Sequence, residues 1–347
     1  MDVSGATAGG EGRHGGSRAA QLQNQNLNTA LIFIKPHAAT AGVEDYLVQR
    51  LSDFHIAVVK RGTAVCTETI IDRHYGVIAT TAFNESPSTL FVGRNGCDAF
   101  EAKRRTSWES AARAGRIISA GQALAALGGD ISELDRIWNS AAATSVKLAG
   151  GMYVRTLPAM CGHPQLSGKD VLNGFYPAMR RKFLGAPIRW FVVEWDAAVL
   201  SWKRFRRDVV GPTKAKDAPR TTIRRHCIEE WKLLGMTEEP TGGDNTIHAS
   251  AGPVEALHER QTWLGTKFKL RDDAFGRKLW AACTGGGKVT EGTPLPQLMR
   301  RWLCNERITV RGVTDSAFEL LEEMDSVDVL SLAAEMEEEA KMMNARL

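Results

Sequence analysis

A continuous apolar run near the N-terminus, residues 30–34, constrains the fold more than any other stretch of the chain. Its sequence is Ala-Leu-Ile-Phe-Ile, the pattern of a central strand that is buried on both faces. Lys35 and Pro36 follow at once, and proline ends the strand because it cannot donate a ladder hydrogen bond. The run therefore predicts a central strand with a lysine at its carboxyl end.

Strands and helices alternate on both sides of a less regular middle region. After the first strand, the patterns predict a helix over residues 43–54, a strand over 56–65 and a helix capped by Thr67. The second block contains a strand, a basic helix capped by Asp196, a helix closed by Gly235, a short strand at His248 and a helix carrying Glu259. Its first three elements are expected over residues 188–195, 196–210 and 222–234.

Composition divides the chain into five segments. Residues 1–26 are rich in small and polar residues and lack the apolar core of a secretory signal, so they predict a disordered leader. Residues 85–173, with Gly-rich joints between short helical patterns, predict an inserted, mainly helical subdomain between two parts of one core, 27–84 and 174–284. Residues 285–347 predict a helical extension that ends in an acidic, Met-rich helix. Helices are expected over residues 108–126, 131–142, 314–332 and 333–347.

Several classes of protein are excluded. The fractions of hydrophobic and charged residues, 43% and 24%, are typical of a soluble globular protein, and no run approaches the roughly 20 apolar residues of a membrane span. Six scattered cysteines form no C-x-x-C pair, which favours a reducing compartment, the cytoplasm, over a zinc or disulfide scaffold. The net charge of +4 does not argue for nucleic acid. Gly285-Gly286-Gly287-Lys288 is not a phosphate loop, because Ala282 and Val289 stand where that motif needs Gly and Ser or Thr.

His248 is the leading catalytic candidate. It lies among small and polar residues, with Asn245 before it, Ser250 after it and the carboxylate of Glu259 on the next helix. A nucleophilic imidazole needs such neighbours to fix its tautomer. If it attacks a phosphoryl group, the site also needs cations, a stacking surface and hydroxyl or amide groups. Element ends supply these groups in Lys35, Tyr75, Phe83, Arg207, Thr213, Arg224 and Asn245.

Each of these residues, taken singly, has a structural explanation. A lysine at a strand end is usually solvated, Arg207 lies in a basic run, and a phenylalanine such as Phe83 fits a core. Their order along the chain is more informative than any one of them.

That order resembles the nucleoside diphosphate kinases. The family's I-K-P motif is matched at Lys35, and its tyrosine and phenylalanine, eight positions apart, at Tyr75 and Phe83. Its arginine, G-x-T and T-I-R motifs are matched in sequence at Arg207, Gly211-Pro212-Thr213 and Thr222-Ile223-Arg224. Its signature N-x-x-H-G-S-D-S is matched by Asn245-Thr246-Ile247-His248-Ala249-Ser250-Ala251-Gly252.

The resemblance implies an α+β fold, a ferredoxin-like βαββαβ sandwich with His248 on a central strand. It implies transfer of the terminal phosphate of ATP to a nucleoside diphosphate through a phosphohistidine on His248, supported by Lys35, Glu259 and Ser250. The nucleoside tri- and diphosphates would contact the substrate-binding residues Lys35, Tyr75, Phe83, Arg207, Thr213, Arg224 and Asn245. Mg²⁺ would be carried on the phosphates, without a protein metal site.

The chain departs from the family pattern in its insert, in additional residues between Arg224 and Asn245, and at Ala249, Ala251 and Gly252. These departures bear on oligomer formation and turnover, and they leave homo-oligomerisation open. They motivate a second hypothesis, a nucleotide-binding structural or regulatory module with little turnover, for example in a cilium or flagellum. Its protein partners would bind the insert or the acidic C-terminal helix. Nucleic-acid binding through the basic residues 180–182 and 203–207 is disfavoured, because no stacking platform accompanies them.

Overall fold

The computed structural model describes residues 26–83, 86–140, 142–213, 215–241, 244–290 and 292–344. The expected leader lies outside these residues, apart from Asn26. The described chain is an α+β protein with two four-stranded sheets and one β-hairpin. None of its helices combines the length and the apolar character that crossing a membrane requires.

The main sheet consists of β1 (Leu27–Ile34), β2 (Ala57–Val65), β7 (Pro187–Asp196) and β8 (Ile247–Ala249), in the order β2-β7-β1-β8. All three pairings are antiparallel, and β1 lies between β7 and β8. Seven of the eight β1 residues are buried, which confirms the central strand predicted from the apolar run. The backbone N–H of Lys35 then bonds Thr246 O, so the predicted lysine stands beside the segment that leads into His248.

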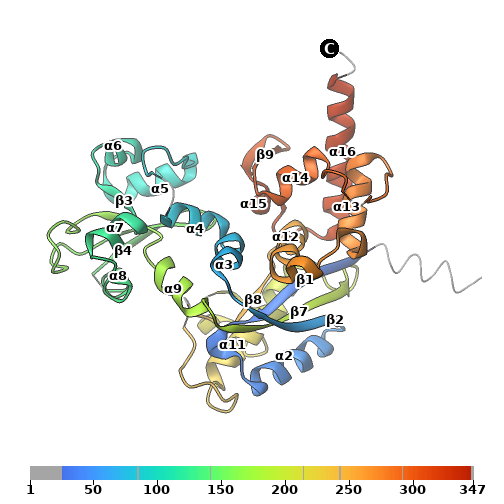
Figure 1. The fold of residues 1–347 in the computed structure, drawn as a ribbon, viewed down its shortest axis with the longest axis horizontal. Helices are drawn as coiled ribbons and strands as arrows, with labels where there is room; N and C mark the ends of the chain where they lie inside the picture. Colours follow the sequence, from blue (N-terminus) through green and yellow to red (C-terminus); the bar gives the residue numbers. More distant parts are fainter. Residues whose placement is uncertain are drawn as a thin grey trace, which may run out of the picture.

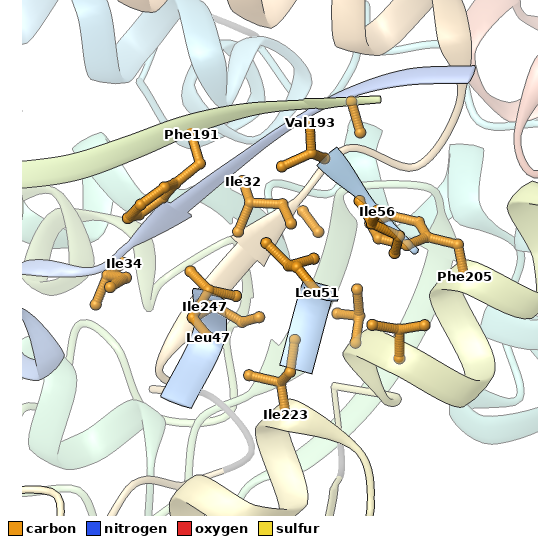
Figure 2. Packing of buried hydrophobic residues seen from close by; sticks show 14 of the residues in the cluster. Ile32, Ile34, Leu47, Leu51, Ile56, Phe191, Val193, Phe205, Ile223 and Ile247 are labelled. Carbon is orange, nitrogen blue, oxygen red and sulfur yellow. The ribbon is translucent and has the colours of Figure 1, made fainter. Parts of the chain in front are cut away.

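Helices cover both faces of this sheet (Figure 1). Ile32 and Ile34 pack against Leu47 and Leu51 of α2 (Ala41–Asp53) and against Ile223 of α11 (Ile223–Glu229), as Figure 2 shows. The alternate β1 residues Leu31 and Phe33 pack on the other face, against Ile71 of α3 (Glu68–His74) and Trp263 of α12 (Pro253–Leu264). The period-2 alternation of a strand thus divides one apolar run between two cores.

Two predicted helices of the core differ in the structure. Ser201, rather than Asp196, caps the basic helix, and the Asp196 carboxylate instead accepts a bond from Ala198 N in the turn after β7. That helix is α10 (Trp202–Arg204) followed directly by the π-helical turn η2 (Phe205–Val210). Helix α11 ends at Glu229, before the predicted stop at Gly235, and Gly235 has a φ of 77° in the turn that follows.

The inserted segment contains a second sheet that the sequence patterns did not predict. Its order is β3-β6-β5-β4, and Asp170 at the start of β6 is fully buried against Arg104 and Arg116. The expected helix over 108–126 is interrupted by a strand, because Gly115 turns the chain with a φ of 63°. The elements are α5 (Arg94–Arg104), α6 (Trp108–Arg113), β3 (Ile117–Ser119), α7 (Ala120–Ala126), α8 (Ile131–Trp138), β4 (Thr144–Ala149), β5 (Met152–Thr156) and β6 (Asp170–Leu172). Helices α4 (Gly76–Phe83) and α9 (Tyr176–Phe183) connect the insert to the core.

The C-terminal extension follows α13 (Ala274–Thr284) and likewise combines helices with strands. Residues expected to begin a helix at 314 form a hairpin strand, and residues 326–344 form one helix where the patterns placed a break. The elements are α14 (Gln297–Leu303), β9 (Arg307–Val310), β10 (Val313–Ser316), α15 (Ala317–Leu321) and α16 (Ser326–Asn344). Short 3-10 turns η1 (Pro36–Ala38), η3 (Ala215–Asp217), η4 (Gly265–Lys267) and η5 (Leu270–Asp272) complete the described elements.

Candidate active site

His248 is held from behind by two buried groups. Strand β8 pairs His248 with Phe33 of β1, and the two rings stack with centroids 4.8 Å apart. His248 Nε2 lies 2.5 Å from Glu259 Oε1, and Ser250 Oγ lies 2.5 Å from Glu259 Oε2. The Glu259 side chain is 1% exposed and that of His248 is 17% exposed. The imidazole is therefore fixed through Nε2, and Nδ1 is its remaining nitrogen.

Burial sets the protonation of this pair. It raises the pKa of Glu259 to about 8 and holds the pKa of His248 well below its usual 6.5, where the charges of Arg224 and Lys35 lower it further. Both effects disfavour the charged forms, so His248 is neutral at neutral pH, as a nucleophilic imidazole must be.

Lys35 and Arg224 bring positive charge to His248. The guanidinium of Arg224 donates to Ile247 O at 3.1 and 3.3 Å and to Gly211 O at 2.9 Å, which fixes it beneath β8. Burial lowers the pKa of Arg224 to about 10, which leaves it charged at neutral pH. Burial and the Arg224 charge lower the pKa of Lys35 to about 8. Two partly desolvated cations beside one imidazole are suited to bind an anion.

A pocket of about 870 Å³ opens at His248. Six residues predicted from the sequence line it: Lys35, Tyr75, Thr213, Arg224, Asn245 and His248. Glu259 and Ser250 lie behind the imidazole, so eight of the ten candidates line the pocket or support its histidine. Their roles in binding and catalysis remain predictions.

Phe83 and Arg207 do not line this pocket. Phe83 lines a separate hollow of about 320 Å³, with its ring 5.6 Å from Tyr176 and 5.6 Å from the Arg180 guanidinium. The Arg207 side chain is 64% exposed and bonds the neighbouring Asp208 at 2.6 Å. The wider π-helical turn of η2 changes the direction of the side chains in this basic run. Arg206, rather than Arg207, is the arginine of the run whose charge acts on His248.

Several lining residues were missed by the sequence analysis. Asp244 bonds Lys182 Nζ at 2.6 Å and lies 3.4 Å from His37 Nδ1, at the edge nearest Asn245. Its place directly before the N-x-x-H motif was the one available signal. The other missed residues belong to the insert and its junction with α9, and no sequence motif marks them as site residues: Trp138, Tyr153, Arg155 and Phe175.

The C-terminal extension contacts the loop after His248. Ala251 O accepts a bond from Glu323 N at 2.9 Å, and a Cβ added at Gly252 would lie 2.6 Å from Leu321 O. Glycine is therefore required at position 252 by contact with the extension, since its φ of −162° is accessible to any residue. This contact gives a physical reason for the glycine at position 252.

The described residues contain one close group of three potential metal ligands, His74, His248 and Glu259, whose ligating atoms lie within 4.8 Å of one another. Two imidazoles do not suit Mg²⁺, which prefers oxygen ligands. This donor set is therefore poorly suited to Mg²⁺.

Comparisons with known proteins give only distant similarities. No protein-family model matches the chain, and no curated protein matches it significantly. Among solved structures, it is similar to the nucleoside diphosphate kinase of Aquifex aeolicus, at 15% identity and a TM-score of 0.33 over 68% of this chain and 94% of that one. The enzyme of Borrelia burgdorferi with bound vanadate and ADP is 15% identical, with a TM-score of 0.31 over 70% of this chain and 89% of that one. The enzyme of Pyrobaculum aerophilum is 17% identical, with a TM-score of 0.34 over 70% of this chain and 97% of that one. No function is inferred from similarities this low.

Proposed function

We propose that the chain is a nucleoside diphosphate kinase-like phosphotransferase that moves the terminal phosphate of a nucleoside triphosphate to a nucleoside diphosphate through His248. One observation carries the proposal: His248 Nε2 is held by the buried Glu259, and the imidazole lines a pocket of about 870 Å³ together with Lys35 and Arg224, whose charges act on it. The order β2-β7-β1-β8, with antiparallel pairing throughout, supports a ferredoxin-like βαββαβ core.

The hydrogen bonds of His248 Nε2, Glu259 and Ser250 are mutually satisfied if Glu259 is a neutral acid. Ser250 Oγ has one proton but lies within bonding distance of two oxygens, Leu31 O at 3.1 Å and Glu259 Oε2 at 2.5 Å. It also accepts from Leu31 N. If Glu259 carries its proton on Oε2 and donates it to Ser250, the serine donates to Leu31 O, and Glu259 Oε1 accepts the His248 Nε2 proton. The lone pair then lies on Nδ1, as attack requires.

In the first half-reaction, the Nδ1 lone pair forms a bond to the terminal phosphorus while the bond to the bridging oxygen breaks. The departing nucleoside diphosphate keeps that electron pair. A second diphosphate reverses the step, so both nucleotides use one site. Lys35 and Arg224 stabilise the phosphoryl oxygens, and Tyr75, Thr213 and Asn245 position the nucleotide. Mg²⁺, bound to the phosphates, supplies further charge neutralisation.

Incubation with ATP labelled on its terminal phosphate tests the proposal. We expect an acid-labile, alkali-stable phosphoenzyme that is absent in His248→Ala and discharged by added nucleoside diphosphate. Glu259→Gln is the matched variant, because glutamine donates to Ser250 and accepts from His248 as a neutral acid does. It should keep most of the labelling, whereas Glu259→Leu should lose it. Normal labelling of His248→Ala would rule the mechanism out.

A nucleotide-binding module with little turnover is the second candidate. Two observations favour it: Arg207 points outward, and Phe83 lies apart from the pocket. Two residues expected to bind the nucleotide therefore do not line the His248 pocket. A ciliary or flagellar scaffold is its concrete form, with partners on the insert or on α16. A coupled diphosphokinase assay separates the two, since a scaffold would turn over no faster than its His248→Ala variant.

For the enzyme we propose a cytoplasmic protein that works without nucleic acid or membrane, with the choice between a monomer and a homo-oligomer left open. Light scattering of the purified chain measures its mass directly. A monomeric mass would exclude the homo-oligomer without contradicting the chemistry.

A further inference from the structure

The pocket at His248 is lined by two chemically different groups of residues. Lys35, Arg224 and His248 are suited to phosphate, whereas Trp138, Tyr153 and Phe175 are aromatic. The Phe175 ring lies 6.0 Å from Trp138 and 6.1 Å from Tyr153, so the three rings form one aromatic cluster. Aromatic side chains next to a phosphate site provide a stacking surface for a nucleobase.

Phe83 is engaged in other contacts. The guanidinium of Arg180 lies over its ring, and the same arginine donates to both carboxylate oxygens of Asp72, at 2.7 and 2.8 Å. A base that stacked on the same face of Phe83 would have to displace this guanidinium. The aromatic side chains that share a cavity with His248 are instead Tyr75 of the core, Trp138 and Tyr153 of the insert, and Phe175 at its junction with α9.

The insert is held firmly against the core at this point. Asn173 is fully buried, and its side-chain amide donates to Thr81 Oγ1 at 2.5 Å and to Gly151 O at 2.9 Å. Its carbonyl oxygen accepts from Tyr153 N at 3.0 Å. These bonds connect α4, β5 and the start of α9, so the aromatic cluster is pre-organised before a ligand binds.

Arg155 adds a hydrogen-bond donor to this end of the pocket. Its guanidinium lies 5.8 Å from the Trp138 ring and donates through Nη1 to Trp138 O. Its Nε is buried and has no hydrogen-bond partner among the described residues. The buried Nε is closed to a ligand in the pocket, so the Arg155 guanidinium can donate to a ligand only through its terminal nitrogens.

Guanine matches this arrangement better than adenine. It presents two acceptors, O6 and N7, to an arginine, whereas adenine presents its N6 amino donor in place of O6. Glu238 and Glu239 also line the pocket, and their carboxylates are suited to accept from the N1 and N2 protons of guanine.

We propose that the insert and its junction with α9 form the base subsite, in which a guanine stacks on Tyr153 and Phe175 and accepts hydrogen bonds from Arg155. This inference rests on the proposed function, because the phosphates at His248 place the base. It assigns the insert a role in substrate selection and predicts a preference for guanine nucleotides.

Calorimetric titration with the Mg²⁺ complexes of GDP, ADP and pyrophosphate tests the subsite. GDP should bind about tenfold tighter than ADP to the unchanged protein, and Arg155→Met should remove that difference. Phe175→Leu, which keeps an apolar side chain, should weaken both nucleotides about tenfold. Phe83→Leu should change neither, and pyrophosphate should bind all of these variants equally.

The opposite pattern overturns the inference. If Phe83→Leu weakens nucleotides and Phe175→Leu does not, the base stacks on Phe83. If Phe175→Leu lowers the affinity for pyrophosphate as much as that for GDP, Phe175 is only structural. If GDP and ADP bind the unchanged protein equally well, the guanine assignment is wrong. Failure of the proposed function has its own signature, since pyrophosphate would then fail to bind or would be insensitive to Lys35→Met.

Discussion

The insert and the C-terminal extension add to the same core in different ways. The insert has a hydrophobic cluster of its own, around Phe100 and Trp108, and reaches the His248 pocket with side chains at its edge. The extension has no separate core. Its cluster around Trp302 includes Val254 and Leu257 of α12, the helix that carries Glu259. The insert thus contributes side chains that line the pocket, whereas the extension packs against α12, the helix whose Glu259 holds the His248 imidazole.

Matched tryptophan substitutions should give the largest contrast between the two regions. Trp302 and Trp108 are 0% and 3% exposed, so truncation of either to alanine should cost about 3–5 kcal/mol of local stability. Trp302→Ala should also remove most phosphohistidine labelling, because its cluster supports α12. Trp108→Ala should keep the labelling while the insert unfolds at a lower temperature. Calorimetry with phosphoenzyme assays measures both effects, and equal loss of labelling would show that the insert also supports the imidazole.

The contact between the extension and the loop after His248 is tested by two glycines. A Cβ at Gly252 would lie 2.6 Å from Leu321 O, so Gly252→Ala should cost about 1–3 kcal/mol through overpacking. Gly76→Ala is the control, because nothing lies within 4 Å of the corresponding Cβ. Urea denaturation of the two variants gives the difference. If Gly252→Ala is as stable as the control, the extension does not press on this loop.

The positions of individual pocket residues show which parts of the site can be derived from the sequence. Lys35, Asn245 and His248 could be predicted because each stands at a strand end or in a short motif, where local sequence determines local geometry. Trp138 and Arg155 could not, because they reach the pocket only through the way the insert folds onto α4 and α9. Its strands, of three to six residues, are too short for alternation to identify.

Two of the predicted site residues show where spacing alone misleads. Phe83 has the expected distance along the chain from Tyr75 and ends α4, but the insert begins directly after it, and its ring packs with Tyr176 and Arg180. Arg207 has the expected distance from Thr213, but η2 is a π-helical turn, and a single extra residue per turn alters which side chain points inward. The central strand, by contrast, depended only on its own apolar residues.

The pH dependence of phosphate binding should separate the two ends of the pocket. Lys35 is charged below its pKa of about 8 and loses its charge above it, so pyrophosphate affinity should fall above pH 8, by up to about tenfold per pH unit. Lys35→Arg should remove the part of that decline that Lys35 contributes, because arginine stays charged, whereas Glu259, with a pKa also raised to about 8, gains negative charge over the same range. Arg155→Met, at the insert end, should leave the decline unchanged. Titrations from roughly pH 6.5 to 9.5, a range that brackets the pKa of Lys35, measure the effect. If the decline in affinity persists unchanged in Lys35→Arg, another titrating group causes it.

The smallest effect is expected where the extension meets the core through charge. Arg206 Nη2 lies 3.3 Å from Glu322 Oε1, but the two side chains are 25% and 38% exposed, so water screens the pair. Glu322→Gln should therefore cost only about 0.2–1 kcal/mol, and less in high salt. The backbone bond from Glu323 N to Ala251 O and the cluster around Trp302 remain in this variant. Urea denaturation in low and high salt measures the cost. If Glu322→Gln loses more than about 2 kcal/mol of stability and salt abolishes that loss, charge rather than packing holds the extension against the loop after His248. The contrast with Trp302→Ala would then reverse.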